Sequence, residues 1–408
     1  MKNKADIIII GGGILGNAIA YYLTRKSSLD VLLIDQNRLF TGSTSLAASL
    51  VTKLRNQTNV IPFIEETHRA IGELEKISGE SLGRRSVGCL HVASSEKYAA
   101  QLGELKQIAQ SFAIHTQTVD QSFIKQRVGW LDPQIITDAL FVPGEFFIDG
   151  VVLGMAYSKA ARKNGLRTLL HCRVTGIRSR NNQVTGVDTE TGFIEAPRII
   201  DAAGIWSNLI LRGSGAMVPL APIRSIYFLT RPDPEQYPLN QPICILPDAN
   251  AYTRPESGAL LLGLRDNRSP WTHPENIPED LNSTSYISQD EEWNILLNET
   301  KGLRRLMHGF SGLQIAHTIA APCAYTHDGN PVLGSVAGLE GLFAASGCNG
   351  GGIAMSAGYG RAMAEWVLGE QPFISLDPYK PGRLKEENPL SEKFMQKCAL
   401  RRSRKISG

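Results

Sequence analysis

The stretch Ile7-Ile8-Ile9-Ile10-Gly11-Gly12-Gly13-Ile14-Leu15-Gly16 places an apolar strand directly before a G-x-G-x-x-G turn, and residues 17–23 continue the turn into an apolar helix. In such a turn Gly11 permits the tight bend, Gly13 lets the backbone approach a pyrophosphate, and Gly16 lets the helix pack against the strand. The helix N-terminus then presents free backbone amides to the phosphates. The stretch therefore predicts a dinucleotide-binding site.

A second strand and an acidic residue follow at the spacing that this site requires. Residues 31–34 are apolar and end at Asp35, about 20 residues past the glycines, where a carboxylate contacts a ribose hydroxyl. Strand, glycines, helix, strand and acid occur in order, which favours a βαβ nucleotide-binding unit over an ordinary glycine-rich loop.

Length and composition are typical of a soluble globular protein with two domains. The 408 residues exceed what one hydrophobic core serves, and no apolar run is long enough for a membrane span. The six cysteines show no C-x-x-C spacing, which argues against zinc, iron–sulfur clusters and a disulfide framework. We expect no metal, reduced thiols, no signal peptide and a cytoplasmic location.

Charge is nearly balanced over the chain but not along it. The net charge of +3 implies no nucleic-acid partner. Residues 381–408 form a basic tail, in which eight lysines and arginines face three glutamates from residue 383 onward, a surplus of five. This tail is interpreted either as a solvated, partly disordered end or as a docking segment for an acidic partner subunit.

Hydrophobic periodicity and turn residues predict the remaining elements. Helices are expected at residues 64–78, 97–113, 150–164 (closing at Gly165), 289–306 and 353–368. Strands are expected at 87–93, at 171–177 and 183–188 around an Asn181-Asn182 turn, and at 198–204, 223–230, 243–246, 259–264 and 341–346. The pattern predicts an α/β fold with a second, antiparallel sheet.

Several motifs resemble the D-amino-acid-oxidase-like family of FAD enzymes, which includes glycine oxidase, monomeric sarcosine oxidase, and sarcosine and dimethylglycine dehydrogenases. Besides the first glycine turn, the matching segments are residues 42–45 (GSTS), 201–207 (DAAGIWS), 326–334 (THDGNPVLG) and 347–352 (GCNGGG). The resemblance covers nearly the whole chain. It implies FAD as the tightly held cofactor, with Asp35 on the adenosine ribose and the second glycine cluster near the flavin ring.

The resemblance implies a Rossmann-like FAD-binding domain with a mixed βαβ sheet and an α+β substrate domain built on an antiparallel sheet. The FAD-binding domain would comprise residues 1–85, 146–215 and 321–380. The substrate domain would comprise residues 86–145 and 216–320, with the basic tail at 381–408.

Two segments have alternative interpretations. Three glycines before the helix at residue 353 favour close approach to the flavin, where the helix amides would stabilise negative charge, but a packing turn would also use them. Ser43, Thr44 and Ser45 are interpreted as pyrophosphate or ribityl contacts, or as a helix-capping cluster. The predicted cofactor-binding residues are Gly11, Gly13, Ile14, Leu15, Gly16, Asp35, Gln36, Ser43, Thr44, Ser45, Ala47, Val174, Ala203, Gly204, Trp206, Gly347, Asn349, Gly350, Gly351, Gly352 and Ile353.

The chain departs from the family pattern where relatives attach flavin or bind substrate. Leu46 stands where sarcosine and dimethylglycine dehydrogenases carry a flavin-linked His, and Cys323 stands where many relatives carry an Arg that binds the substrate carboxylate. Arg254 or Arg224 would have to supply that charge. Residues 323–326 (CAYT) reproduce the segment through which monomeric sarcosine oxidases attach flavin, so Cys323 is interpreted as a flavin attachment point or as a buried thiol, with non-covalent FAD expected.

The leading hypothesis is oxidation of a C–N bond in a small amine or amino acid, by hydride transfer to flavin N5, giving an imine. His327, Tyr252 and Arg254 are the predicted catalytic residues, with Tyr325 as a further general-base candidate. Residues 260–263 lack the oxygen-activating Lys of sarcosine oxidases, so the electron acceptor stays open. The alternatives are an FAD-dependent 2-hydroxy acid or polyol dehydrogenase, and a flavin-bearing electron-relay or scaffold subunit of a hetero-oligomer.

Overall fold

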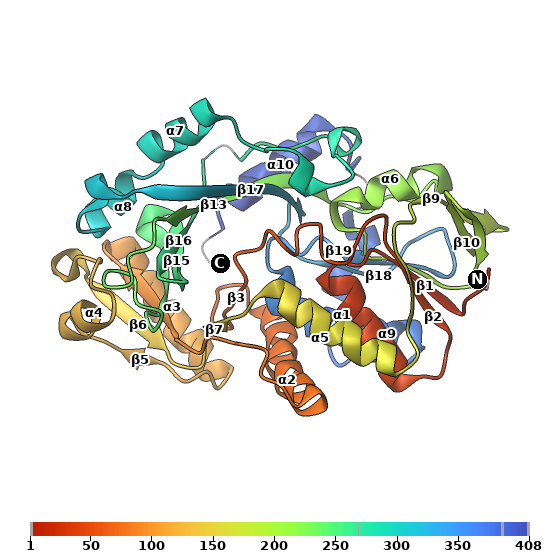
Figure 1. Cartoon of the computed structure of the whole chain (residues 1–408), viewed down its shortest axis with the longest axis horizontal. Helices are drawn as coiled ribbons and strands as arrows, with labels where there is room; N and C mark the ends of the chain where they lie inside the picture. Colours follow the sequence, from red (N-terminus) through yellow and green to blue (C-terminus); the bar gives the residue numbers. More distant parts are fainter. Residues whose placement is uncertain (1–2, 268, 385–386, 406–408) are drawn as a thin grey trace.

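The glycine turn belongs to a six-stranded sheet at one end of the molecule (Figure 1). The computed structural model describes residues 3–267, 269–384 and 387–405. The strand order is β18 (Val332–Ser335), β19 (Leu342–Ser346), β12 (Ile199–Asp201), β1 (Ile7–Ile10), β2 (Val31–Ile34), β8 (Arg167–Leu169). All neighbours pair in parallel except β18 and β19, which are antiparallel. This is the mixed sheet that the βαβ pattern predicts.

Strand β1 is buried on both faces, so its isoleucines alternate between two cores. Ile7 and Ile9 pack with α1 (Ile14–Lys26), α2 (Ile61–Ser78), α5 (Gly150–Lys163) and α9 (Gly352–Val367). Ile8 and Ile10 pack with the small sheet of β9 (Val174–Arg180), β10 (Gln183–Thr189) and β11 (Gly192–Glu195). Continuous apolar runs are typical of such strands.

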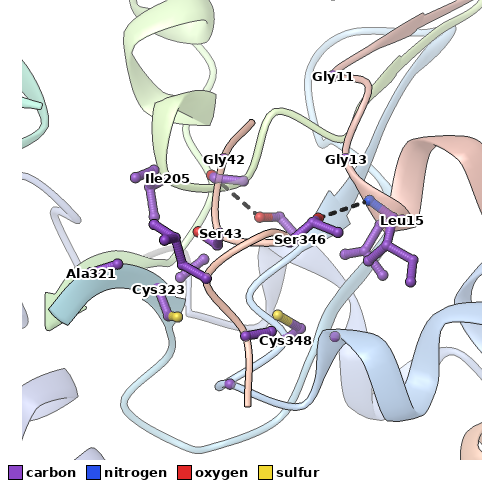
Figure 2. Close-up of a pocket in the computed structure, with 18 of the residues that line it drawn as sticks. Gly11, Gly13, Leu15, Gly42, Ser43, Ile205, Ala321, Cys323, Ser346 and Cys348 are labelled. Carbon is purple, nitrogen blue, oxygen red and sulfur yellow. Dashed lines mark hydrogen bonds between the residues drawn. The ribbon is translucent and has the colours of Figure 1, made fainter. Parts of the chain in front are cut away.

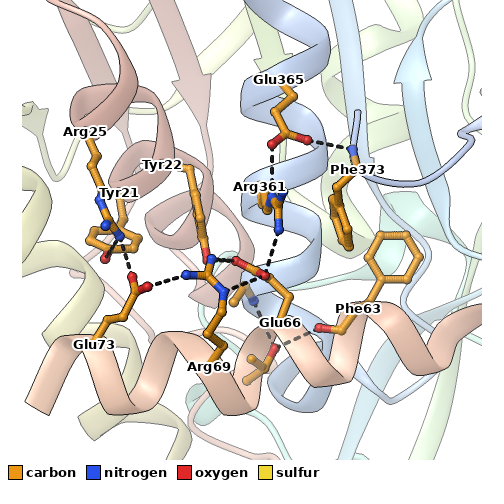
Figure 3. A network of polar contacts seen from close by, with 12 residues as sticks. Tyr21, Tyr22, Arg25, Phe63, Glu66, Arg69, Glu73, Arg361, Glu365 and Phe373 are labelled. Atoms are coloured by element: carbon orange, nitrogen blue, oxygen red, sulfur yellow. Dashed lines mark hydrogen bonds and ion pairs between the residues drawn. The ribbon is translucent and has the colours of Figure 1, made fainter. Parts of the chain in front are cut away.

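An ionic network around the buried carboxylate of Glu66 ties three of the helices together on one face of the sheet (Figure 3). Glu66 on α2 accepts hydrogen bonds from Tyr22 on α1, from Arg69 one turn further along α2, and from Arg361 on α9 at 3.1 Å. Only 4% of its side chain is exposed. Burial alone would raise the pKa of Glu66, but the hydrogen bonds from Arg69 and Tyr22 outweigh that effect and lower it.

The second, eight-stranded sheet forms the other half of the molecule. Its order is β17 (Ile315–Tyr325), β13 (Ala221–Thr230), β16 (Ala259–Leu264), β15 (Ala251–Glu256), β14 (Ile243–Leu246), β4 (Cys89–Ala93), β6 (Asp138–Val142), β5 (Gln117–Thr118). Only β14 and β4 pair in parallel. Helices α3 (Glu96–Ser111), α4 (Gln121–Arg127), α7 (Gln289–Asn298) and α8 (Lys301–Leu306) belong to this half.

Short elements complete the described structure. Strands β3 (Leu50–Val51) and β7 (Phe146–Phe147) pair antiparallel, and α6 (Ser207–Leu211) follows β12. The Asn181-Asn182 turn is confirmed, with both residues at positive φ (51° and 60°) between β9 and β10. No helix within the described ranges is long and apolar enough to cross a membrane.

Two expectations are corrected. The single helix predicted for residues 289–306 is two helices, α7 and α8, because the chain turns at Glu299 and Thr300. The proposed division of the chain into domains stays a prediction, and strand β17 crosses its boundary at residues 320 and 321. The interpretation of the tail as a solvated, partly disordered end is wrong for its described residues, since it forms α10 (Glu392–Ser403) packed on β13 and β17.

Candidate active site

A cavity lies between the two sheets, and the first glycine turn forms part of its wall (Figure 2). The other walls come from residues 40–50, from residues 202–206 after β12, from β13, β16 and β17, from residues 348–354, and from Arg402 and Lys405. Segments from the whole length of the chain therefore meet around one space.

The glycine turn is held in a shape that side chains would not allow. Gly11 has a φ of 109°, and a Cβ there would lie 2.5 Å from the Ala202 carbonyl oxygen. A Cβ on Gly16 would lie 2.0 Å from the Gly11 oxygen, so α1 approaches the strand as closely as backbone permits. The buried Asn17 amide donates to the Gly12 and Gly13 carbonyls at 2.9 and 3.0 Å and fixes the turn.

Helix α1 directs its N-terminus at this cavity. Its N-cap residue Gly13 makes no side-chain cap bond, and its first turn carries no acidic residue. Thr44 Oγ1 accepts from the Ile14 amide at 3.1 Å, so one of the serine and threonine candidates caps the helix while also lining the cavity. The cavity at this end is suited to an anion such as a pyrophosphate.

Asp35 stands at the end of β2, on the cavity wall. Its carboxylate accepts from the Gly12 amide at 2.6 Å and from the Asn37 amide at 2.7 Å. Burial raises the pKa of Asp35, and these backbone bonds act against that shift. The carboxylate is thus fixed beside the turn, where it can accept a hydrogen bond from the ribose of a nucleotide bound as in such folds.

The second glycine cluster forms the turn from β19 into α9. Asn349 and Gly350 have positive φ values of 51° and 75°, and the N-cap residue Gly351 makes no side-chain cap bond. The Asn349 side chain accepts from the Thr326 amide at 2.9 Å, so this turn is tied to the end of β17. Gly352 and Ile353, at the N-terminus of α9, line the cavity.

These residues fit FAD. Two helix N-termini, a glycine turn that excludes side chains and a fixed carboxylate line one cavity between the sheets. The predicted cofactor residues that line it are Gly11, Gly13, Ile14, Leu15, Asp35, Gln36, Ser43, Thr44, Ala47, Val174, Ala203, Gly204, Trp206, Gly350, Gly351, Gly352 and Ile353. Gly16, Ser45, Gly347 and Asn349 lie outside the lining.

The predicted catalytic residues do not all lie at the cavity. Tyr252 lines the cavity, but His327 and Arg254 do not. His327 Nε2 lies 3.0 Å from Glu387 Oε1, and the His327 ring packs against Phe394. The catalytic roles of His327, Tyr252 and Arg254 stay predictions, and of these three only Tyr252 lines the cavity.

Two arginines proposed to supply the missing charge are engaged elsewhere. Arg254 donates to the Ala48 carbonyl at 2.7 Å and to Glu256 at 2.5 Å. Arg224 is buried and pairs with Asp266 at 2.8 Å. Arg224 Nε has no hydrogen-bond partner among the described residues, but neither Arg224 nor Arg254 lines the cavity. Neither is therefore placed to bind a substrate carboxylate there.

Arg265 is the residue that sequence reasoning missed. It follows the apolar strand β16, lines the cavity and is 5% exposed. Both terminal nitrogens, Nη1 and Nη2, lack a hydrogen-bond partner among the described residues. Burial lowers the pKa of Arg265 to about 10. A buried guanidinium without a partner is costly unless an anion joins it.

The tail contributes two further cations. Arg402 on α10 pairs with Asp266 at 2.7 Å, and Lys405 donates to the Asn349 carbonyl at 2.9 Å. Burial, with the charges of Arg55, Arg265 and Arg402, lowers the pKa of Lys405 to about 7. Nothing in the residue pattern of a basic tail distinguishes these two positions from solvated charges.

Hydroxyl and thiol groups also line the cavity. Burial raises the pKa values of Tyr227 and Tyr325 to about 12 and that of Tyr252 above its ordinary value, so all three stay protonated at neutral pH. Burial also raises the pKa values of Cys323 and Cys348, the latter to about 11. Among the described residues, no group of three or more histidine, cysteine or acidic side chains is placed to hold a metal.

Comparison with known proteins agrees with this geometry. Residues 6–366 match the family model described as FAD-dependent oxidoreductase. The chain is 25% identical over 90% of its length to the pyruvate dehydrogenase phosphatase regulatory subunit of Mus musculus, and 25% identical over 93% to sarcosine dehydrogenase of Homo sapiens. It spans 41% of each of these relatives.

Among solved structures, L-proline dehydrogenase from P. horikoshii superposes with a TM-score of 0.81 at 21% identity, covering 95% of this chain and 99% of that chain. This likeness confirms the fold. Together with the family match over most of the sequence, it agrees with a cavity that fits FAD between two sheets. The chain belongs to the FAD-dependent oxidoreductase family.

Proposed function

We propose that this protein oxidises the C–N bond of a small amine that carries a carboxylate, that is, an amino acid or an N-alkyl amino acid. The observation that supports this most directly is Arg265, a buried guanidinium in the cavity with two unpartnered nitrogens. A planar, two-pronged donor of this kind matches a carboxylate. Relatives that include sarcosine and dimethylglycine dehydrogenases support the same substrate class.

The chain's own residues would bind and orient the substrate. Arg265 would hold the carboxylate, and the ring of Tyr252 beneath its guanidinium would keep the guanidinium in place. Tyr227 and Tyr325 remain hydrogen-bond donors because burial keeps them protonated. The apolar remainder of the cavity would exclude water from the reacting carbon.

One lining residue is suited to hold the proton that the amine must lose. Lys405 reaches the cavity from the tail, and its pKa of about 7 lets it accept a proton near neutral pH. When bound, FAD supplies the ring that accepts the hydride. We propose that Arg265 binds the substrate carboxylate and that Lys405 accepts the amine proton.

A second candidate is a flavin-bearing regulatory or scaffold subunit. It is favoured by the similarity to a phosphatase regulatory subunit, which is as high as that to sarcosine dehydrogenase. A partner that docks on the tail stays a prediction. Three of the tail cations, Arg383, Lys397 and Arg402, already pair with acidic residues of the chain itself and are less available to such a partner. A cytoplasmic location likewise stays a prediction, supported by six free thiols.

The test is anaerobic stopped-flow observation of the visible flavin band in the FAD-loaded protein. Three matched compounds are compared: an N-methyl amino acid, the same amine without its carboxylate, and the corresponding 2-hydroxy acid. Bleaching by the amino acid with release of an imine product supports the proposal. Bleaching by the hydroxy acid alone replaces it with C–O oxidation, and a flavin that no compound reduces favours the subunit role.

A further inference from the structure

A second cavity adjoins the flavin cavity and is lined by three arginines and a lysine, Arg55, Arg401, Arg404 and Lys405. It lies between the chain before α2, the 326–331 turn and the end of α10, and its volume is about 160 Å³. None of its lining residues is acidic. Like charges gathered in one hollow repel each other, so their placement needs an explanation.

The cations occupy different depths. Arg55 is 4% exposed, and its Nε has no hydrogen-bond partner among the described residues, while its Nη2 donates to Thr52. Glu145 interacts with Arg55 through space, but it accepts the Lys53 and Leu54 amides and does not line the cavity. Arg55 therefore keeps an unpaired donor in the interior.

Arg401 and Arg404 are exposed residues that also line the cavity. The Arg401 guanidinium lies against Gly329, where an added Cβ would come within 2.4 Å of its Nε. Neither arginine forms an ion pair with any described residue, in contrast to Arg402 between them. Both side chains line the cavity.

We propose that this cavity binds a small phosphate-bearing anion, held by Arg55, Arg401, Arg404 and Lys405. Four cations without a lining carboxylate suit a dianion better than a monoanion, and a phosphate monoester carries about −1.5 to −2 charges at pH 7. Arginine forks bind phosphate oxygens in pairs. A hollow of about 160 Å³ admits a phosphate with a few attached atoms and excludes a nucleic-acid duplex.

The proposed site is coupled to the flavin cavity by shared walls. Tyr325, Cys348, Gly351 and Lys405 line both cavities. A dianion beside Lys405 keeps that ammonium charged, so it changes the electric field at the flavin. By linkage, flavin and anion then alter each other's affinity by the same factor.

The experiment uses FAD-loaded protein, whose pyrophosphate site is filled, and no amine substrate, so its result is independent of the proposed function. Inorganic phosphate, glycerol phosphate and acetate are titrated calorimetrically at constant ionic strength. We expect one phosphate site per chain and acetate binding weaker by about tenfold or more. A preference for glycerol phosphate identifies an ester as the ligand, and a preference for inorganic phosphate identifies the free ion.

Variants locate the site. Arg401→Gln and Arg404→Gln should each weaken phosphate binding by about tenfold, whereas the exposed control pair Arg180→Gln and Arg231→Gln should leave it unchanged. In phosphate-free buffer the melting temperature of the site variants should stay level or rise, because repulsion is relieved. Absence of phosphate binding, equal binding of acetate, or unchanged affinity in both site variants would overturn the proposal.

Discussion

The guanidinium of Arg265 lies over the ring of Tyr252, with its Cζ 5.7 Å from the ring centroid, and both side chains line the cavity. The contact holds a buried cation in place without supplying a hydrogen-bond acceptor. The cavity therefore contains a fixed positive charge whose donors remain available, which is the arrangement that an incoming carboxylate requires.

Replacing Arg265 should separate binding of the carboxylate from binding of the flavin. In Arg265→Met, flavin reduction by an amino acid should slow by about tenfold to a hundredfold, since charge-assisted hydrogen bonds are lost. Reduction by the matched amine without a carboxylate should change little. Stopped-flow rates at several substrate concentrations measure both effects. Equal loss with both compounds would show that Arg265 acts on the fold or the flavin.

The two glycines of the first turn should respond differently to alanine. Gly11→Ala places a Cβ within 2.5 Å of a backbone oxygen at a φ of 109°, so the apoprotein should lose about 1–3 kcal/mol of unfolding free energy. Gly13→Ala meets only Thr44 Oγ1 at 3.4 Å, so the chain should fold normally. Its FAD affinity should nevertheless fall by about tenfold or more, because the pyrophosphate loses its close approach. Urea unfolding and flavin fluorescence quenching give the two quantities, and normal FAD affinity in Gly13→Ala would contradict the expectation.

The Glu66 network should stabilise the fold in a pH-dependent way. Glu66→Gln should cost about 1–3 kcal/mol at neutral pH, because Arg69, Arg361 and Tyr22 lose an ionised acceptor. Since the folded-state pKa of Glu66 lies below its ordinary value of 4.5, this stability is present above pH 4.5 and is lost as the pH falls through the folded value.

Glu73→Gln is the matched control, since Glu73 also pairs with Arg69 and lies on the same helix. Its side chain is 25% exposed, so its effect should be well under that of Glu66→Gln. Denaturant unfolding at acid and neutral pH compares the two variants. A difference between wild type and Glu66→Gln that persists unchanged in acid would argue against an ionised Glu66.

Lys405 should give flavin reduction an inflection near neutral pH. A neutral Lys405 accepts the amine proton, so the reduction rate should rise as the pH passes about 7. The pKa of Lys405 is about 7 in the folded protein and 10.5 in the unfolded chain, so between these values the unfolded chain binds more protons than the folded one. The free energy of unfolding should therefore rise with pH across that window. In Lys405→Met both dependences should disappear, whereas the exposed Lys393→Met on α10 should keep them. A wild-type profile that stays flat around pH 7 would remove Lys405 from the proton transfer.

Flavin should be released when the protein is precipitated with acid. Attachment through Cys323 needs its thiolate, and burial raises the pKa of this thiol. Absorbance of the supernatant and the intact mass of the chain distinguish free from attached flavin. If flavin stays with the pellet, loss of that fraction in Cys323→Ala but not in Cys348→Ala would identify the attachment point.

Local rules predicted much of the fold because they act over short distances. The βαβ unit from Ile7 to Asp35 and the Asn181-Asn182 hairpin need only neighbouring residues, and both are confirmed. The break at Thr300 was missed because the hydrophobic pattern remains helical on both sides of it. In the structure the Thr300 hydroxyl donates to the Leu296 carbonyl at the end of α7. The tail was misinterpreted because its charges find their partners far away in sequence, as Arg402 finds Asp266.

The active-site charges were predicted less well for the same reason. Arg254 and Arg265 both border apolar strand segments, and their sequence surroundings do not distinguish them. Only the register of the sheet turns Arg254 toward Ala48 and Glu256, and Arg265 toward the cavity. Which arginine is satisfied depends on distant backbone atoms, and no local pattern contains that information.

The flavin cavity joins Gly11, near one end of the chain, to Lys405, near the other. The residues that line it are therefore separated by almost the whole described sequence. Contacts between residues so far apart form slowly, because closing a long loop costs entropy. Proteolytic fragments from either half should stay colourless, while retained flavin marks a molecule whose two sheets have both assembled. Because a ligand bound only by the native state stabilises it by mass action, release of flavin fluorescence on heating should report global unfolding and not the opening of one loop.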